Sequence, residues 1–450
     1  MNRKDPVTLT EKEHLRLRVV SEVQAGRRSV AEAAEVLRLS QRHVRRLRAG
    51  LEREGAAAFM HGNRGRPPPW RISDELRARV AALGSGRYAA CNDTHLRGLL
   101  LRDEGIFLSR SSVRRIRRQA GQRPKQRHRP PRHRSRRDRR PQEGMLLQTD
   151  GSRHPWFGAD LPRCTLLGAI DDATGKVPAA LFRAEEDTQG YFLLLGQVLK
   201  DQGIPWELYH DRHSIFENHD KRPWTLQEEL RGRGQPTQFA RALEELGIIS
   251  IASYSPEARG RIERLWRTFQ DRLVVELKLA GIKDIKAANR FLPGFLKRFN
   301  ARFAIAAEEP GLAYRPLDPG LDLERILSFR YERVVARDNT VLLEERLIQI
   351  PPGPRRRSYF AAHVWVHELV DGSLGVWYQD QWIARSSARG DSPTLRARKR
   401  RPQRPKARPP LPQRLPLPAS ETSKTPEPHP WRTWNPGYLA RDRRTESLTS

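Results

Sequence analysis

Three acidic residues of this chain could together bind divalent metal ions. Asp150 ends the apolar run MLLQTD, Asp211 ends the run ELYHD, and Glu263 lies in the helical stretch RGRIERLWRTFQDRL. Mg²⁺ prefers carboxylate oxygens, and two such ions about 4 Å apart can stabilise both the attacking and the leaving oxygen of a phosphodiester. The three residues therefore predict metal-dependent phosphodiester chemistry, with both aspartates held at strand ends and the glutamate presented by a nearby helix.

Each carboxylate also has a purely structural interpretation. Asp150 could cap the turn that follows it, and Glu263 could form an ordinary ion pair on its helix. Asp211 could pair with Arg212 or His213. The order and spacing of the three residues, taken jointly, favour the metal site over these alternatives.

Further residues near the three acids have open roles. Asp171 and Asp172 follow another strand, but the phrase AIDDATG is better explained as a turn between adjacent strands. Trp266 could stack on a flipped base, although packing in the core is favoured. His210 and His213 flank Asp211 and could bind zinc, but phosphate contact or core packing is the preferred interpretation.

The composition predicts a polyanionic partner. The chain has 84 Lys and Arg against 53 Asp and Glu, which gives a net charge of +31. Such a charge favours binding to nucleic acid through counterion release. No apolar run approaches the roughly 20 residues of a membrane span, and the first residues lack a signal-peptide core. Cys91 and Cys164 are the only cysteines and form no CxxC motif, so we expect a cytoplasmic protein without a disulfide framework or structural zinc.

The elements that precede the acidic residues predict an all-α N-terminal region with two helix-turn-helix modules. Residues 1–60 contain three helical stretches with apolar faces, the middle one including Val36, and the last carries exposed arginines typical of a recognition helix. The predicted DNA contacts of this first module are Arg42, Arg45, Arg46 and Arg48. An ordinary three-helix bundle with a basic face is the alternative.

A second module is expected at residues 70–121, after a short Gly- and Pro-containing linker. The outer face of its last helix is predicted to carry Arg114, Arg115, Arg117 and Arg118. The following residues 122–142 are almost entirely Arg, Pro, His and Gln, and predict an extended basic linker. Its effect on DNA binding should be electrostatic and independent of DNA sequence.

Residues 143–310 predict an α/β catalytic core. Three apolar runs separated by short turns indicate an antiparallel meander, and helices then alternate with two more strands. This order is that of a ribonuclease-H-like domain. Residues 325–388 alternate apolar and polar positions and predict a small β-barrel that could face DNA. Residues 389–450 are basic and rich in proline, and predict a disordered tail.

The phrases QTDGSRHPWFG, LLGAIDDATGKV, YHDRHSIF and SPEARGRIERLWRTFQDRLV resemble insertion-sequence transposases of the ISNCY type. These belong to the retroviral-integrase superfamily, whose catalytic core carries a DDE triad. The resemblance implies that Asp150, Asp211 and Glu263 bind two Mg²⁺ or Mn²⁺ ions. It also implies hydrolytic nicking at transposon ends, followed by attack of the freed 3′-hydroxyl on target DNA.

The resemblance also guides the choice of DNA contacts near the triad. Many related enzymes carry Lys or Arg seven residues after the glutamate, where this chain has Gln270. The DNA-contact role is therefore assigned to Arg259 or Arg267. The expected partners are double-stranded transposon-end and target DNA, bound by a homo-oligomer in a bacterial nucleoid, with no membrane and no small-molecule substrate.

Two other functions remain open from the sequence. One is a non-catalytic DNA-binding regulator derived from a transposase, although a repressor has no need for three metal-binding carboxylates. The other is a nuclease acting on RNA-containing hybrids. Two helix-turn-helix modules favour duplex DNA over such hybrids, because they suit the B-form major groove.

Overall fold

The computed structural model describes residues 8–64, 70–125, 137–219, 229–230, 234–253, 259–354, 356–388 and 394–398. The chain divides into two compact units, Met1–Ala397 and Arg398–Ser450, and the description below concerns the first. Most of the predicted disordered tail, the middle of the predicted basic linker and residues 65–69 of the first linker lie outside the described residues. Within the described part, no helix combines the length and apolar character that a bilayer span requires.

The first module is a three-helix unit, as the sequence predicts. Its helices are α1 (Glu11–Gln24), α2 (Val30–Leu37) and α3 (Gln41–Glu54), followed by the 3₁₀ turn η1 (Gly55–Phe59). Ser29 and Ser40 cap α2 and α3 by accepting backbone N–H groups. Small residues let the helices approach closely around Val19 and Val44. Val36, expected in this core, is instead 47% exposed, because Ala33 and Ala34 occupy the inner face of α2.

The second module consists of α4 (Asp74–Ser85), α5 (Asp93–Glu104) and α6 (Arg110–Gln119). The prediction that Arg117 lies on the exposed basic face of α6 is wrong, because this residue is only 4% exposed. Its guanidinium points inward and donates to the carbonyl of Cys91 at 3.0 Å and to Asp93 at 2.9 Å. Arg117 lies one helical turn after buried Val113 and beside buried Ile116, so helical periodicity places it on the inner face of α6, where Cys91 and Asp93 satisfy its charge.

The α/β region is built on a five-stranded sheet with the order β3-β2-β1-β4-β5. Its strands are β1 (Leu146–His154), β2 (Cys164–Asp171), β3 (Ala179–Arg183), β4 (Glu207–His210) and β5 (Ile249–Ala252). The first three pair antiparallel, whereas β4 and β5 run parallel to β1. The predicted meander followed by alternating elements is therefore present.

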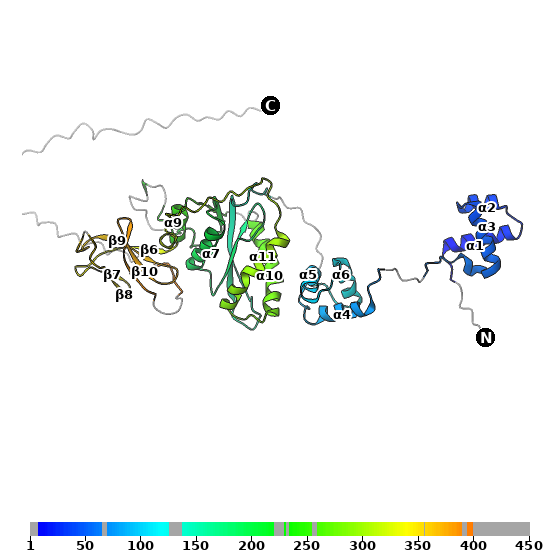
Figure 1. The fold of residues 1–450 in the computed structure, drawn as a ribbon, viewed down its shortest axis with the longest axis horizontal. Coiled ribbons are helices and arrows are strands. Elements are labelled where there is room, and N and C mark those ends of the chain that lie inside the picture. The colour runs from blue at the N-terminus through cyan, green and yellow to red at the C-terminus, as the bar shows by residue number, and fades with distance from the viewer. Residues whose placement is uncertain are drawn as a thin grey trace, which may run out of the picture. The chain divides into compact units, whose positions relative to one another are not determined.

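Helices cover both faces of this sheet (Figure 1). One face packs on α7 (Thr188–Asp201) and α9 (Gln238–Glu245), and the other on α10 (Gly260–Leu279) and α11 (Ile285–Phe303). The alternation along β2 explains the two layers, since Leu167 belongs to the first cluster and Leu166 to the second.

The C-terminal region is not the predicted barrel. After α12 (Leu323–Ile326), a four-stranded sheet has the order β11-β10-β9-β6, and a separate hairpin pairs β7 with β8. The strands are β6 (Phe329–Val334), β7 (Thr340–Leu343), β8 (Arg346–Gln349), β9 (His363–Glu368), β10 (Leu374–Tyr378) and β11 (Gln381–Ser386). Among the described residues β6 and β11 remain edges, because the apolar face of the sheet is buried against α7 and α9 instead of closing on itself.

The predicted linker and tail are both partly ordered on the core. Arg139 donates to the carbonyl oxygens of Asp172 and Ala173 at 3.2 and 2.7 Å, and Arg140 pairs with Glu207 at 2.6 Å. Leu395, within the predicted tail, is buried in the core. The basic run 137–140 therefore has a structural role that its composition did not reveal.

Candidate active site

Asp150 and Asp211 lie at the same level of two adjacent strands. The parallel pairing of β1 with β4 ends at Gln148 and Tyr209, and each aspartate follows two residues later. Asp150 does not end its strand as predicted, because β1 continues to His154 by pairing with β2, where Asp150 lies opposite Gly168. The two carboxylates thus flank the point where β1 loses its partner β4.

A single guanidinium interacts with both aspartates. Arg259, immediately before α10, lies 2.5 Å from an Oδ of Asp150 and 3.8 Å from an Oδ of Asp211. Asp211 also accepts the backbone N–H of His213 at 3.0 Å, while the neighbouring Arg212 pairs with Glu217 at 2.9 Å. Of the two alternative partners, Arg212 or His213, Asp211 contacts His213 through its backbone, and the cation that it shares with Asp150 is Arg259.

The second contact of Asp150 comes from Trp266 on α10. Its indole Nε1–H donates to the other carboxylate oxygen at 2.9 Å. The same ring lies against Gly168, where a Cβ atom would approach the indole to 2.8 Å. Trp266 is 6% exposed, so the expectation of core packing is confirmed, with a polar contact to the candidate site in addition.

Glu263 lies on α10 near Trp266, but its carboxylate does not form a group with those of Asp150 and Asp211. It lies in the first turn of α10, four residues after Arg259, which precedes the helix, and three before Trp266, which is its neighbour one turn along. Its side chain is exposed, however. Within the described residues, no group of three His, Cys, Asp or Glu side chains could hold a metal ion. The structure therefore brings together two of the three predicted ligands, Asp150 and Asp211, and does not place Glu263 with them.

Burial changes the acidity of Asp150. Removal from water raises the pKa of its carboxyl from 3.8 to about 6, and this effect outweighs the opposing contributions of Arg259 and Trp266. The nearby charges of Glu186 and Asp211 raise this pKa further. A desolvated carboxylate with acidic neighbours favours additional positive charge, which is the electrostatic condition for binding a cation.

Glu186 is an additional acidic residue near the site that the sequence interpretation missed. Its carboxylate accepts the Tyr191 hydroxyl at 2.6 Å and lies against Gly151, where any Cβ would collide with it. The signal was present as the acidic run Glu185-Glu186-Asp187 after β3. Its relevance depends on tertiary contact with Gly151, which follows Asp150 directly.

The first turn of α10 is attached to the sheet by polar contacts. Arg261 pairs at 2.6 Å with Asp172, which is fully buried and also accepts Gln148 at 3.0 Å. The same Gln148 side chain accepts the N–H of Ile262 at 3.4 Å. Asp172 therefore has the structural role expected of it, and through Arg261 it fixes the helix turn that carries Glu263.

The other predicted residues near the site fall into two groups. His210 is 1% exposed, stacks on Phe216 and bonds Ser250 at 2.7 Å, so of the two roles preferred for it, phosphate contact or core packing, the structure shows core packing. Gln270 donates to Ser152 at 3.2 Å, so its position is occupied by a structural contact. The arginines predicted to contact DNA, apart from the paired Arg259, are exposed: Arg42, Arg45, Arg46, Arg48, Arg114, Arg115, Arg118 and Arg267.

Comparison with known proteins gives three findings. Residues 16–78 match the family model described as winged helix-turn helix. The chain is 36% identical over 371 residues to "Putative transposase y4bF" of Sinorhizobium fredii (strain NBRC 101917 / NGR234), covering 82% of this chain and 79% of that protein. It is 29% identical over 382 residues to the "Transposase for insertion sequence IS1202" of Streptococcus pneumoniae, covering 76% of this chain and 78% of that protein.

Solved structures give weaker similarity. One chain of a simian T-cell lymphotropic virus intasome, solved with a PP2A regulatory subunit, aligns with 69% of this chain at 13% identity and a TM-score of 0.30. The catalytic core domain of HTLV-2 integrase, solved with magnesium, aligns with 33% at 14% identity and a TM-score of 0.23. The family assignment therefore rests on the sequence relatives and not on the solved structures.

Proposed function

The chain belongs to the insertion-sequence transposase family, and on this basis we propose that it binds transposon ends and catalyses metal-dependent DNA cleavage and strand transfer. Asp150, Asp211 and Glu263 are the proposed catalytic carboxylates. The observation that carries this proposal is the parallel register that sets Asp150 and Asp211 side by side, sharing one cation, beside the helix that bears Glu263.

The donor set fits the divalent ions that this chemistry uses. Asp150 and Asp211 supply hard oxygen ligands and already share the positive charge of Arg259. Glu263 would supply the third carboxylate from the first turn of α10. When bound, two Mg²⁺ or Mn²⁺ ions would activate the attacking oxygen and stabilise the leaving oxygen.

The residues around the carboxylates prepare the site for DNA. Strand β1 and the Trp266 indole fix the Asp150 side chain, so its oxygens require little reorganisation. Arg259 competes with metal ions for the same oxygens. We therefore expect its guanidinium to exchange the aspartates for a DNA phosphate when metal and DNA bind, which retains its predicted role as a DNA contact.

DNA recognition is assigned to the N-terminal modules. The exposed arginines of α3 and α6 suit contact with a major groove and its phosphates. Two modules can read a long, asymmetric sequence such as a transposon end. We propose that a homo-oligomer holds two such ends together with target DNA, and that residues 143–310 perform the chemistry.

The test is a set of charge-removing substitutions in the full-length chain. Asp150→Asn, Asp211→Asn and Glu263→Gln should each abolish Mg²⁺-dependent nicking and strand transfer on a transposon-end duplex, while binding to that duplex persists. Asp160→Asn, which changes an exposed carboxylate away from the site, is the control and should keep full activity. Near-normal nicking by one variant removes that residue from the site. A wild-type chain that binds ends without cutting them supports the alternative of a non-catalytic regulator.

A further inference from the structure

The second helix-turn-helix module packs directly on the catalytic helix α10. Its apolar cluster contains Leu96, Leu99 and Leu100 of α5, and the same cluster includes Val275 of α10, with Leu279 packed at its edge. Val275 is 6% exposed. Since the catalytic core supplies part of the module's own hydrophobic cluster, the module and α10 form one packed unit.

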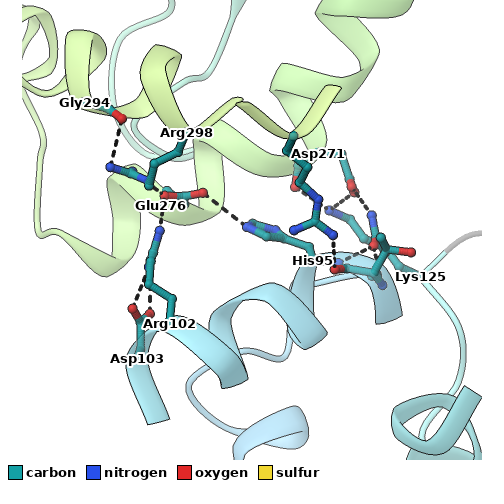
Figure 2. A network of polar contacts seen from close by, with 11 residues as sticks. His95, Arg102, Asp103, Lys125, Asp271, Glu276, Gly294 and Arg298 are labelled. Atoms are coloured by element: carbon teal, nitrogen blue, oxygen red, sulfur yellow. Dashed lines mark hydrogen bonds and ion pairs between the residues drawn. The ribbon is translucent and has the colours of Figure 1, made fainter. Parts of the chain in front are cut away.

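A buried carboxylate lies at the centre of this contact (Figure 2). Glu276 of α10 accepts Arg102 of α5 at 2.8 Å and Arg298 of α11 at 2.9 Å through one oxygen. Its other oxygen lies 3.4 Å from Nε2 of His95, which is itself 2% exposed. One side chain on the catalytic helix therefore contacts both the DNA-binding module and the neighbouring core helix.

Further polar contacts lie beside Glu276. Asp271, also on α10, accepts the side chain of Asn92 and pairs with Lys125 at 2.6 Å. Arg302 of α11 donates to the carbonyl of Thr94 at 3.1 Å. The Arg302 guanidinium lies against Gly98 of α5, where a Cβ atom would approach it to 2.6 Å. Four polar contacts from α5 and its N-cap, and one from Lys125 after α6, thus reach α10 and α11.

The surroundings of Glu276 favour its ionised form. Burial opposes its charge, but the close approach of His95 and the hydrogen bonds from Arg102 and Arg298 more than compensate and lower its pKa to about 2. Burial also lowers the pKa of His95, against the opposing effect of Glu276. The contact is therefore a charged carboxylate held by two guanidinium groups, with the His95 imidazole beside its other oxygen.

We infer that Glu276 is a positioning residue that fixes the second DNA-binding module relative to the catalytic carboxylates of the same chain. Helix α10 has 20 residues and so spans about 30 Å, with Glu263 in its first turn and Glu276 near its last. Docking uses α5, whereas Arg114, Arg115 and Arg118 of α6 stay exposed and available to DNA. The distance between the bound end sequence and the cleaved phosphodiester is then set within one subunit. This inference rests on the proposed function.

The docking itself can be tested without any activity. A zero-length carbodiimide reagent should join Lys125 to Asp271 in the full-length protein, because their side chains already form an ion pair. Mixing isotope-labelled and unlabelled protein before coupling distinguishes links within one chain from links between chains. Mass spectrometry should find the Lys125–Asp271 link within single chains. Absence of the link, or its formation only between chains, would overturn the inference.

The positioning role requires a second measurement, the distribution of cleavage sites along an end-containing duplex. The double variant Arg102→Gln with Arg298→Gln removes both guanidinium partners of Glu276, and Glu276→Gln removes the charge itself. Both should lower the yield of the Lys125–Asp271 link and reduce the ratio of cleavage at the end boundary to cleavage elsewhere by about tenfold or more. Arg290→Gln, on an exposed position of α11, should change neither.

The outcomes separate this inference from the proposed function. General loss of folding would lower all cleavage equally, whereas loss of positioning spreads cleavage over other sites. Sharp end cleavage by the double variant, with its cross-link lost, would overturn the role of Glu276 alone. Absence of metal-dependent cleavage by the wild-type chain would overturn the proposed function, while the cross-link still decides the docking.

Discussion

Trp266 donates its indole N–H to Asp150 across the junction between α10 and the sheet, at 2.9 Å. The tryptophan is also buried against Gly168, directly opposite Asp150 on the neighbouring strand. One side chain therefore serves both the hydrophobic core and the proposed catalytic carboxylate. This relationship makes the site sensitive to substitutions that leave the core nearly unchanged.

Trp266→Phe should shift the pH dependence of cleavage. Phenylalanine keeps an aromatic ring in the core but removes the N–H that favours the ionised form of Asp150. The pKa of that carboxyl should then rise further above its ordinary value, and the acidic limb of the pH–rate profile for nicking should move to higher pH. Trp70→Phe is the control, because Trp70 is 82% exposed. An unchanged acidic limb would show that the indole does not tune Asp150.

Asp150→Asn should stabilise the metal-free protein at neutral and alkaline pH. The pKa of Asp150 is raised from 3.8 to about 6 in the folded state, so ionisation opposes folding. The favourable contribution of the protonated carboxyl is complete below pH 3.8 and is lost as the pH rises through 6. The neutral variant avoids this loss, which amounts to about 1–3 kcal/mol.

Thermal unfolding in a chelator at pH 5 and pH 8 measures this effect. The variant should melt above the wild type at pH 8, with a smaller difference at pH 5. Glu263→Gln, at an exposed position, should melt like the wild type at both. A variant that melts below the wild type at pH 8 would mean that the contact with Arg259 outweighs the cost of burial.

Asp172→Asn should destabilise the core. Asp172 is fully buried and pairs with Arg261 and Arg137. Removing one partner of a buried ion pair leaves an uncompensated charge and costs about 3 kcal/mol or more. The melting temperature of the variant should fall by several degrees, whereas Asp160→Asn should not change it. The residual folded protein should keep nicking activity, because Asp172 is assigned a structural role; complete loss of nicking by well-folded protein would contradict that assignment.

The arginines at the centre of the basic linker should contribute to DNA affinity through charge alone. Each that neutralises a phosphate adds about 0.9 to the log–log salt slope of binding. Glutamine at Arg127, Arg129, Arg132, Arg134 and Arg136 should flatten that slope on end and random duplexes alike, with discrimination between them preserved. These positions lie outside the described residues, and Arg137, Arg139 and Arg140 must be left intact because they contact the core. Equal slopes with lost discrimination would mean that the segment reads sequence.

Local patterns predicted the elements well, because strands and helices follow from side-chain periodicity. The meander, the two modules and the exposed arginines of α3 and α6 were all identified in this way. The position of Asp150 within β1 was not, because the length of a strand depends on its neighbour, and β2 extends β1 beyond the expected end.

Contacts between distant residues could not be predicted from local patterns. Arg117 was expected outside because its helix is basic, but its partners are Asp93 of α5 and Cys91 in the loop before it. The pairing of Arg259 with Asp150 and the approach of Glu186 to Gly151 likewise require the assembled sheet. The prediction of a β-barrel was wrong for the same reason, since the apolar face of the C-terminal sheet packs against α7 and α9.

The docking of α5 on α10 and α11 also limits how such proteins can diverge. A lineage that acquires new end sequences can alter the exposed arginines of α6 one at a time, since few structural contacts depend on them. Replacing the whole second module is a different matter, because an incoming α5 must match Glu276, Asp271 and Arg302 of the recipient core. Relatives should therefore inherit this module together with the C-terminal half of α10. Chimeras of two relatives that exchange the second module together with the C-terminal half of α10 should cleave DNA ends better than chimeras joined at the linker.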